Sequence, residues 1–364
     1  MTIILFLAIL AVLVFVHELG HFVAAKAFGI RVDEFAIGFP PKIFGWQKGE
    51  TKYSLNLIPF GGYVKIFGEN PDDESINGAD SARSFVNAKK WKQAVVLLAG
   101  IFMNLVFAWI LISISFNIGL TSSITDEYRN ETKNVSVMIL SVQEKSPAEK
   151  AGIKSGDHIL SIKSGDVFQV SPNVEFIQKT IAESKDKIII EYKRNSATGT
   201  VEVVSQNGVV EGKKAIGISM GMVGTVEFGF FRSFYEGAKL MFIETKSITI
   251  GLYSFITGIF MAEEGLFSQV AGPIGIANMV GEARNVGLSY LLGFVAMISI
   301  NLAMLNLVPF PALDGGRVLF VAIEAIIRRR IKPIIANWVN GIGFLLLIVL
   351  MIVVTFKDVL RLIK

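Results

Sequence analysis

Long apolar runs without charges dominate the chain and predict its main elements. The first extends from Thr2 to about Ala25, and Glu18 is its first charge. The other three lie between charged residues, namely Lys92 and Asp126, Arg284 and Asp314, and Lys332 and Lys357. A bilayer core of about 30 Å requires about 20 apolar residues in a helix. Each run is long enough to cross a membrane, so the pattern predicts four transmembrane helices.

Two further features of the apolar pattern affect this topology. A fifth uncharged run, Ser247 to Ala262, is too short to cross and favours an interfacial or re-entrant helix at about residues 235–262. The first run could instead be a cleaved signal peptide, since Ala25 and Ala27 form an A-x-A-like site. It lacks a basic start and carries ionisable residues late, which favours a retained span.

Between the second and third runs the pattern changes to short β-rich stretches separated by polar and glycine-containing turns. These lie around residues 135–142, 157–162, 187–192, 200–204 and 215–220, with a helical stretch near 173–184. The pattern predicts a small mixed α+β domain at residues 135–223. It would be inserted between a first membrane part, residues 1–125, and a second, residues 224–364, with transmembrane helices at about 285–313 and 333–356.

A predicted β-hairpin follows the first span, at about residues 53–67. Residues Tyr53–Leu57 alternate in polarity, the sequence Pro-Phe-Gly-Gly at 59–62 suits a turn, and Tyr63–Phe67 would return as a second strand. A free strand edge is a template for another strand. The edge residues that could bind an extended peptide are Tyr63, Val64, Lys65 and Ile66. An ordinary cytoplasmic hairpin is the alternative.

Composition and charge narrow the class of protein. Apolar residues make up 52% of the chain and charged residues 18%, which is typical of a polytopic membrane protein. The absence of cysteine excludes disulfides, thiolate metal sites and a cysteine nucleophile. The net charge is +4, but Lys and Arg cluster beside the apolar runs, within residues 26–92 and 328–332. This distribution favours a topology signal over nucleic-acid binding and predicts that both segments are cytoplasmic.

The strongest chemical motif is His17-Glu18-Leu19-Gly20-His21, an H-E-x-x-H sequence inside the first span. Residues four apart lie on nearly the same helix face, so both imidazoles could bind one metal ion beside Glu18. Ionisable residues within a membrane helix are costly and usually functional. Histidines that only pair with polar groups inside the bundle are the alternative. The isolated His158 is expected to be a solvated surface residue.

A catalytic zinc usually has three protein ligands, so the motif leaves one ligand to be found. Asp314 is the candidate, because it is the carboxylate that follows the third span. Pro309 and Pro311 interrupt the helix before it, and Gly315 permits a close backbone approach after it. Irregular backbone at membrane depth is tolerated where it is buried or lines a watery cavity. An ordinary helix N-cap is the alternative for Asp314.

Together these motifs resemble the site-2 protease family, and especially its bacterial RseP-type members. The resemblance is carried by H-E-L-G-H at 17–21, by N-x-x-P-x-P-x-L-D-G-G at 306–316 and by further segments along nearly the whole chain. It implies zinc bound by His17, His21 and Asp314, with Glu18 as general base and Asn306 contacting the substrate backbone. It also implies that the hairpin is a re-entrant element and that the inserted domain is a PDZ domain.

The chain departs from the family pattern in two places. There is room for one PDZ-sized insert, whereas the best-known RseP-type members carry two. In the second span the usual G-P-x-x-N sequence lacks its proline, although Gly100 and Asn104 remain. Asn104 is still expected to face the bundle. Ile216, Gly217 and Ile218 form the strand edge at which a PDZ domain could add a peptide.

The sequence thus predicts a multi-pass protease of the bacterial inner membrane, with the PDZ-like domain and both termini outside the cytoplasm. Its expected substrates are transmembrane segments of single-span proteins, such as anti-sigma factors or remnant signal peptides. The inserted domain could gate substrates by size or capture a peptide. A divalent-metal transporter and an inactive PDZ scaffold are the rival functions, although a scaffold would not need Glu18.

Overall fold

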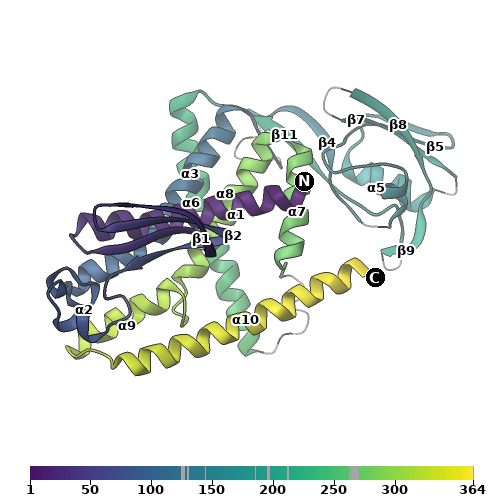
Figure 1. Ribbon diagram of the computed structural model, residues 1–364. Coiled ribbons are helices and arrows are strands. Elements are labelled where there is room, and N and C mark those ends of the chain that lie inside the picture. Colours follow the sequence, from purple (N-terminus) through teal and green to yellow (C-terminus); the bar gives the residue numbers. More distant parts are fainter. Residues whose placement is uncertain are drawn as a thin grey trace. The chain divides into compact units, whose positions relative to one another are not determined.

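The computed structural model describes residues 1–123, 128, 131–143, 145–184, 186–194, 197–210, 213–261, 263 and 270–363 (Figure 1). Asp126 and Ala262, which bound two of the apolar runs, lie outside the described residues. By its contacts the chain divides into two compact units. Unit 1 comprises residues 1–110, 239–275 and 295–361, and unit 2 comprises residues 111–238, 276–294 and 362–364.

The helices and strands follow one another along the chain in a fixed order. The helices are α1 (Thr2–Ala27), α2 (Asp73–Asn77), α3 (Lys90–Asn117), α4 (Pro147–Lys150), α5 (Val174–Glu183), α6 (Phe230–Phe260), α7 (Pro273–Val286), α8 (Leu288–Leu307), α9 (Asp314–Ile327) and α10 (Pro333–Ile363), with 3-10 turns at Ser81–Arg83 and Phe85–Asn87. The strands are β1 (Val32–Lys48), β2 (Thr51–Ile66), β3 (Leu120–Ser123), β4 (Lys133–Val142), β5 (His158–Ser164), β6 (Val167–Val170), β7 (Ile188–Arg194), β8 (Ala197–Val203), β9 (Gln206–Val210), β10 (Lys213–Ala215) and β11 (Ile218–Val226).

Within the described ranges, four helices are long and apolar enough to cross a membrane: α1, α3, α8 and residues Pro333–Leu360 of α10. They coincide with the four predicted spans, so this part of the fold class is confirmed. Two of them are shorter than predicted. Helix α3 ends at Asn117 and is followed by β3, and α8 ends at Leu307 because Pro309 and Pro311 cannot continue a helix. The predicted interfacial segment forms the longer helix α6.

The structure corrects the predicted hairpin at residues 53–67. Residues 52–55 and 62–65 of β2 do not pair with each other; both stretches pair with residues 34–37 of β1. Phe35, for example, lies opposite both Tyr53 and Val64. The second half of β1 pairs with β2 across the turn at residues 49–50. The elongated sheet in Figure 1 therefore comprises all of β1 and β2.

This sheet packs against the C-terminal part of α1 and against α3. Ala25, Val32, Phe35, Val64 and Val96 are buried together in one hydrophobic core. Burial of aliphatic and aromatic side chains of this size contributes about 1.5–3 kcal/mol each. The core therefore fixes the sheet to the helix that carries the H-E-x-x-H motif.

Helix α10 is anchored near its C-terminal end to the start of α7. Asp358 is 5% exposed, and its carboxylate accepts hydrogen bonds from the Gly272 and Gly275 amides at 3.2 and 2.9 Å. A side chain at Gly272 would collide with this carboxylate. Amides that point toward the carboxylate at a helix start stabilise it without a cationic partner. This contact fixes α10 to the Ala-Gly-Pro-Ile-Gly segment at residues 271–275.

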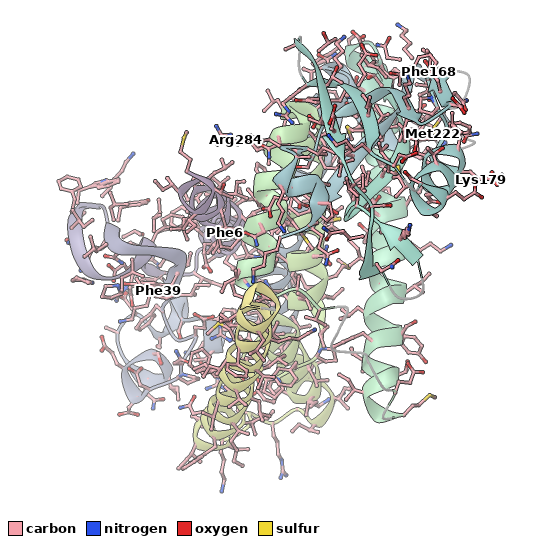
Figure 2. All side chains as sticks on the ribbon, turned by 90° about the vertical axis from the view of Figure 1, so that its right-hand side faces the viewer. Phe6, Phe39, Phe168, Lys179, Met222 and Arg284 are labelled. Carbon is pink, nitrogen blue, oxygen red and sulfur yellow. The ribbon has the colours of Figure 1, made fainter. Side chains whose placement is uncertain are left out.

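Unit 2 contains an antiparallel sheet with strand order β3-β11-β4-β5-β7-β8, with β6 paired to β5. Helix α5 packs on it, and Ile139, Ile159, Ile162, Ile177 and Ile190 are fully or almost fully buried in the shared core. The predicted β-rich stretches and helix correspond to β4, β5, β7, β8, β11 and α5. Figure 2 shows Phe168 on β6 and Lys179 on α5 projecting from this unit.

One buried ion pair stabilises this sheet. Asp157 has a fully buried side chain, and the Arg194 guanidinium donates to its two carboxylate oxygens at 2.6 and 2.7 Å. The Lys154 amide donates to the same carboxylate at 2.9 Å. Asp157 directly precedes β5 and Arg194 ends β7, so the pair joins two adjacent strands at one end.

We predict that Arg194→Met destabilises this sheet by about 2–3 kcal/mol, since it leaves a buried carboxylate without its cation. Hydrogen exchange of the β5 and β7 amides in the detergent-solubilised protein would measure the loss. Lys187→Met is the matched control, because the Lys187–Glu202 pair is exposed and should contribute about 0–1 kcal/mol. Equal protection in the two variants would contradict the prediction.

Candidate metal centre

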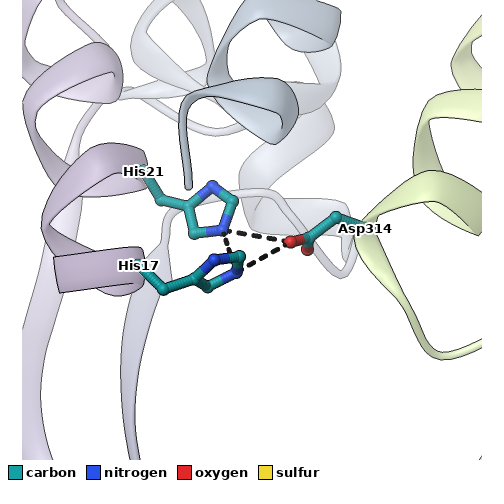
Figure 3. A group of neighbouring side chains, drawn as sticks. All are labelled: His17, His21 and Asp314. Atoms are coloured by element: carbon teal, nitrogen blue, oxygen red, sulfur yellow. Dashed lines mark hydrogen bonds and ion pairs between the residues drawn. The ribbon is translucent and has the colours of Figure 1, made fainter. Parts of the chain in front are cut away.

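Three potential metal ligands converge in unit 1 (Figure 3). His17 and His21 lie one helical turn apart on α1, and Asp314 is the first residue of α9. Their ligand atoms all lie within 4.8 Å of one another, and both histidines are 7% exposed. The sequence spacing predicted the proximity of the two histidines, whereas Asp314 reaches them across nearly the whole chain.

The distances within this triad fit a tetrahedral metal site. Asp314 Oδ2 lies 2.9 Å from His17 Nε2 and 3.4 Å from His21 Nε2, and the two Nε2 atoms are 3.2 Å apart. A zinc ion with bonds of 2.0–2.1 Å at tetrahedral angles would hold its ligand atoms about 3.3 Å apart. Three donor atoms already stand at this spacing, so the residues fit zinc and leave a fourth position for water or substrate.

The second nitrogen of His21 has a partner that fixes its tautomer. His21 Nδ1 donates to the Val96 carbonyl of α3 at 2.8 Å. A carbonyl can only accept, so in the neutral ring the Nε2 atom carries the free lone pair. This arrangement directs Nε2 toward the metal position, as outer hydrogen bonds of metal-binding histidines usually do.

Asn104 provides the corresponding contact for His17. The Asn104 side chain is fully buried on α3 and lies 3.2 Å from His17 Nδ1 through its amide nitrogen, while its Oδ1 has no hydrogen-bond partner among the described residues. A half-turn of the amide about its last side-chain bond would pair Oδ1 with His17 Nδ1–H and free His17 Nε2 for a metal. The buried oxygen without a partner is thus a further sign of a metal-binding imidazole.

Two glycines allow α1 and α3 to approach closely at this site. A Cβ on Gly20 would lie 2.3 Å from the Ala99 carbonyl oxygen, and a Cβ on Gly100 would lie 2.5 Å from His21 Nε2 and 2.9 Å from His17 Cε1. The space that a side chain at Gly100 would occupy is therefore filled by the two imidazoles.

The segment that carries Asp314 is equally compact. After α8 the chain turns through Pro309 and Pro311, and α9 begins at Asp314. A Cβ on Gly315 would lie 2.3 Å from the Leu307 carbonyl oxygen, and one on Gly316 would lie 2.2 Å from the Phe310 carbonyl oxygen. The Gly-Gly sequence thus lets α9 pack on the turn. The N-cap alternative for Asp314 is wrong, since Leu313 is the N-cap of α9 and Asp314 is the first residue of the helix.

The other predicted site residues occupy different environments. Glu18 is partly exposed beside His17, and Asn306 is partly exposed in the last turn of α8. Within β2, Val64 and Ile66 are buried in the core, whereas Lys65 is exposed and Tyr63 partly exposed. His158 accepts or donates a hydrogen bond with Ser136 at 2.8 Å, and burial lowers its pKa. The prediction that His158 is merely solvated is therefore wrong.

The predicted peptide edge in unit 2 is only partly available. The Ile216 and Gly217 carbonyls already accept hydrogen bonds from the Ala148 and Gln143 amides, and Gly217 has a φ of 82°. Ile218 begins β11 and pairs with Val142 of β4. Strand β3 pairs with β11 only from Val223 to Val226. Among the described residues, the second side of β11 before Val223 has no strand partner, so the edge begins at Ile218.

Sequence reasoning missed two contributions to the site. The Val96 carbonyl is a backbone group, so no side-chain motif identifies it. Gly100 has a sequence signal, since it lies four residues before Asn104 on the same helix face. That spacing places both residues on one face of α3, but it does not reveal that the two imidazoles occupy the space beside Gly100.

We predict that Gly100→Ala reduces zinc affinity by about tenfold or more, because the new methyl group displaces both imidazoles. Zinc titration of the purified protein would measure this loss. Gly251→Ala in α6 is the matched control, since no atom in the part of the chain that the structure describes lies within 4 Å of its added Cβ. Wild-type zinc affinity in Gly100→Ala would show that the histidines do not form the metal site.

The names of known proteins similar to this chain are consistent with a zinc site. The model of Peptidase family M50 matches residues 5–350. A predicted zinc metalloprotease of Clostridium perfringens is 37% identical over 364 residues, covering 99% of each chain. Zinc metalloprotease RasP of Oceanobacillus iheyensis is 30% identical over 442 residues, and Regulator of sigma-W protease RasP of Bacillus subtilis is 29% identical over 436 residues, each covering 99% of both chains. The chain therefore belongs to Peptidase family M50, the site-2 protease family that its motifs resemble.

Proposed function

We propose that this chain is an intramembrane zinc metalloprotease that cleaves transmembrane segments of single-span membrane proteins. The convergence of His17, His21 and Asp314 at ligand spacing is the observation that carries this proposal. The names of the relatives, zinc metalloprotease and regulator of sigma-W protease, support the cofactor and a membrane-protein substrate. Anti-sigma factors and remnant signal peptides are the candidate substrate classes.

The protein groups divide the chemistry between them. His17 and His21 would hold zinc through Nε2, and Asp314 through a carboxylate oxygen. Zinc supplies Lewis acidity toward the scissile carbonyl and the attacking water. Glu18 is the general base, because it lies next to His17 on α1 and is a partly exposed residue. It takes the proton from the attacking water and returns it to the leaving amine.

Substrate binding requires a locally unwound helix, because helical peptide bonds are internally hydrogen-bonded. Asn306 and the edge formed by Tyr63, Val64, Lys65 and Ile66 would hold the exposed backbone. The strand register supports this role for the β2 edge, since residues 62–65 pair with β1 on one side. No other described strand pairs with their second side. Pro309, Pro311, Gly315 and Asn104 support the site rather than contact the substrate.

The membrane orientation is proposed from the distribution of basic residues. Lys and Arg concentrate in the segments joining spans one and two and spans three and four, which the positive-inside rule assigns to the cytoplasm of a bacterial inner membrane. The domain at residues 135–223 and both termini would then be extracytoplasmic. We propose that this domain is PDZ-like and admits substrates whose outer portion has been trimmed. Cleavage of a substrate before and after removal of its outer domain would test this selection.

The rival functions have less support. A divalent-metal transporter needs ligands along a path, and the described residues contain one group of three or more potential metal ligands. An inactive scaffold would not require a partly exposed Glu18 beside two correctly spaced histidines. An inactive scaffold also gives no reason for α3 to hold the Nδ1 atoms of both imidazoles.

We predict that Glu18→Gln abolishes cleavage and retains zinc, because an amide keeps the size of the side chain but cannot accept the proton. Loss of a general base typically costs about 10²–10⁴-fold in rate. Cleavage of a model single-span substrate in liposomes and the zinc content of the same preparation would be measured together. Asp314→Ala should lose zinc as well as activity. Substantial turnover by Glu18→Gln would exclude Glu18 as the base.

Asn306→Ala should slow cleavage without lowering zinc content, since its proposed contact is with the substrate backbone. The loss should be smallest for substrates whose own span is rich in helix breakers, because these need less help to unwind. Asn301→Ala is the matched control in α8, where the Asn301 amide donates to the Met297 carbonyl of its own helix. An equal loss for all substrates would indicate a structural role for Asn306.

A further inference from the structure

The turn before Asp314 has an unusual backbone conformation. Ala312, two residues before Asp314, has a φ of 73°. This left-handed conformation is unfavourable for residues with a Cβ and persists where surrounding contacts enforce it. The Leu313 side chain provides no cap for α9. Contacts from other elements add to the hydrogen bond within the turn, in which the Leu313 amide donates to the Phe310 carbonyl at 3.2 Å.

One such contact comes from the last transmembrane helix. Asn340 of α10 accepts a hydrogen bond from the Ala312 amide through Oδ1 at 3.2 Å. The backbone amide can only donate, so the facing atom of Asn340 must be its oxygen. An amide side chain within an apolar span is costly without a partner. Asn340 therefore has a specific use at this position.

A second contact lies one turn further along the same helix. A Cβ on Gly343 would lie 2.5 Å from Pro311 Cβ and 2.7 Å from the Pro311 carbonyl oxygen. Gly343 thus gives Pro311 room against the helix backbone. Among the described residues, nothing lies within 4 Å of a Cβ added to Gly341, two residues earlier. The close approach is confined to the helix face that carries Asn340 and Gly343, which are three residues apart.

We propose that Asn340 is a positioning residue for the third metal ligand. Its hydrogen bond holds Ala312 in the left-handed conformation, and Gly343 seats Pro311 beside it. The two contacts together orient the first turn of α9 so that the Asp314 carboxylate faces the histidines. This inference rests on the proposed function, in which Asp314 binds zinc.

The test measures zinc affinity and the unfolding temperature of the metal-free full-length protein. Asn340→Leu should weaken zinc binding by about 10–100-fold, as loss of an outer contact typically does, with the metal-free unfolding temperature unchanged. Asn337→Leu is the matched control, because Asn337 is an exposed residue one turn earlier on α10. Gly343→Ala should also weaken binding, and Gly341→Ala should not.

A second substitution separates a positioning role from general packing. Ala312→Gly removes the cost of the left-handed conformation, so it should restore about fivefold in zinc affinity to Asn340→Leu. It should not rescue Gly343→Ala, in which the defect is steric. Wild-type affinity in Asn340→Leu, or the absence of rescue by Ala312→Gly, would overturn the proposal. If Asp314→Ala also bound zinc normally, the ligand assignment itself would fail; if only Asn340→Leu did, the proposed function would stand.

Discussion

The need to satisfy every polar group at a site enclosed by apolar helices governs this structure. His17 and His21 lie in a helix whose other buried positions are apolar, so each ring nitrogen requires a defined partner. Helix α3 supplies one partner for each histidine, the Val96 carbonyl and the Asn104 amide. The remaining nitrogens converge on Asp314. The glycines at positions 20 and 100 serve the same requirement, because they bring the two helices close enough for these contacts.

The buried Asp157 and the partly exposed Asp314 illustrate different ways of compensating the charge of a carboxylate. Asp157 in unit 2 is neutralised by Arg194, so the chain alone completes the arrangement. Asp314 instead meets two imidazoles whose outer nitrogens already have partners. A cation from outside the chain completes this second cluster more effectively than a protonated histidine, since it satisfies all three groups at once. The first pair therefore stabilises a fold, whereas the second is suited to binding.

Local patterns in the sequence predicted the features that depend on local structure. The four spans follow from uncharged length, and the proximity of His17 and His21 follows from helical spacing. The strands of unit 2 follow from alternation. The pairing of β2 could not be obtained in this way, because residues 53–57 alternate identically whether they face residues 63–67 or Phe35 and its neighbours. The sequence also did not predict the contact between Asn340 and Ala312, since an asparagine in an apolar helix does not indicate which backbone amide will donate to it.

Helix α10 is attached at two points that serve different elements, Asn340 to the turn before Asp314 and Asp358 to the start of α7. Eighteen residues of helix separate them, which corresponds to about 27 Å, close to the thickness of a bilayer core. A span fixed at both ends cannot change its tilt without moving one of the attached segments. Lipids of different chain length change the preferred tilt of a transmembrane helix. A change in bilayer thickness therefore reaches the turn before Asp314 or the start of α7 through the tilt of α10.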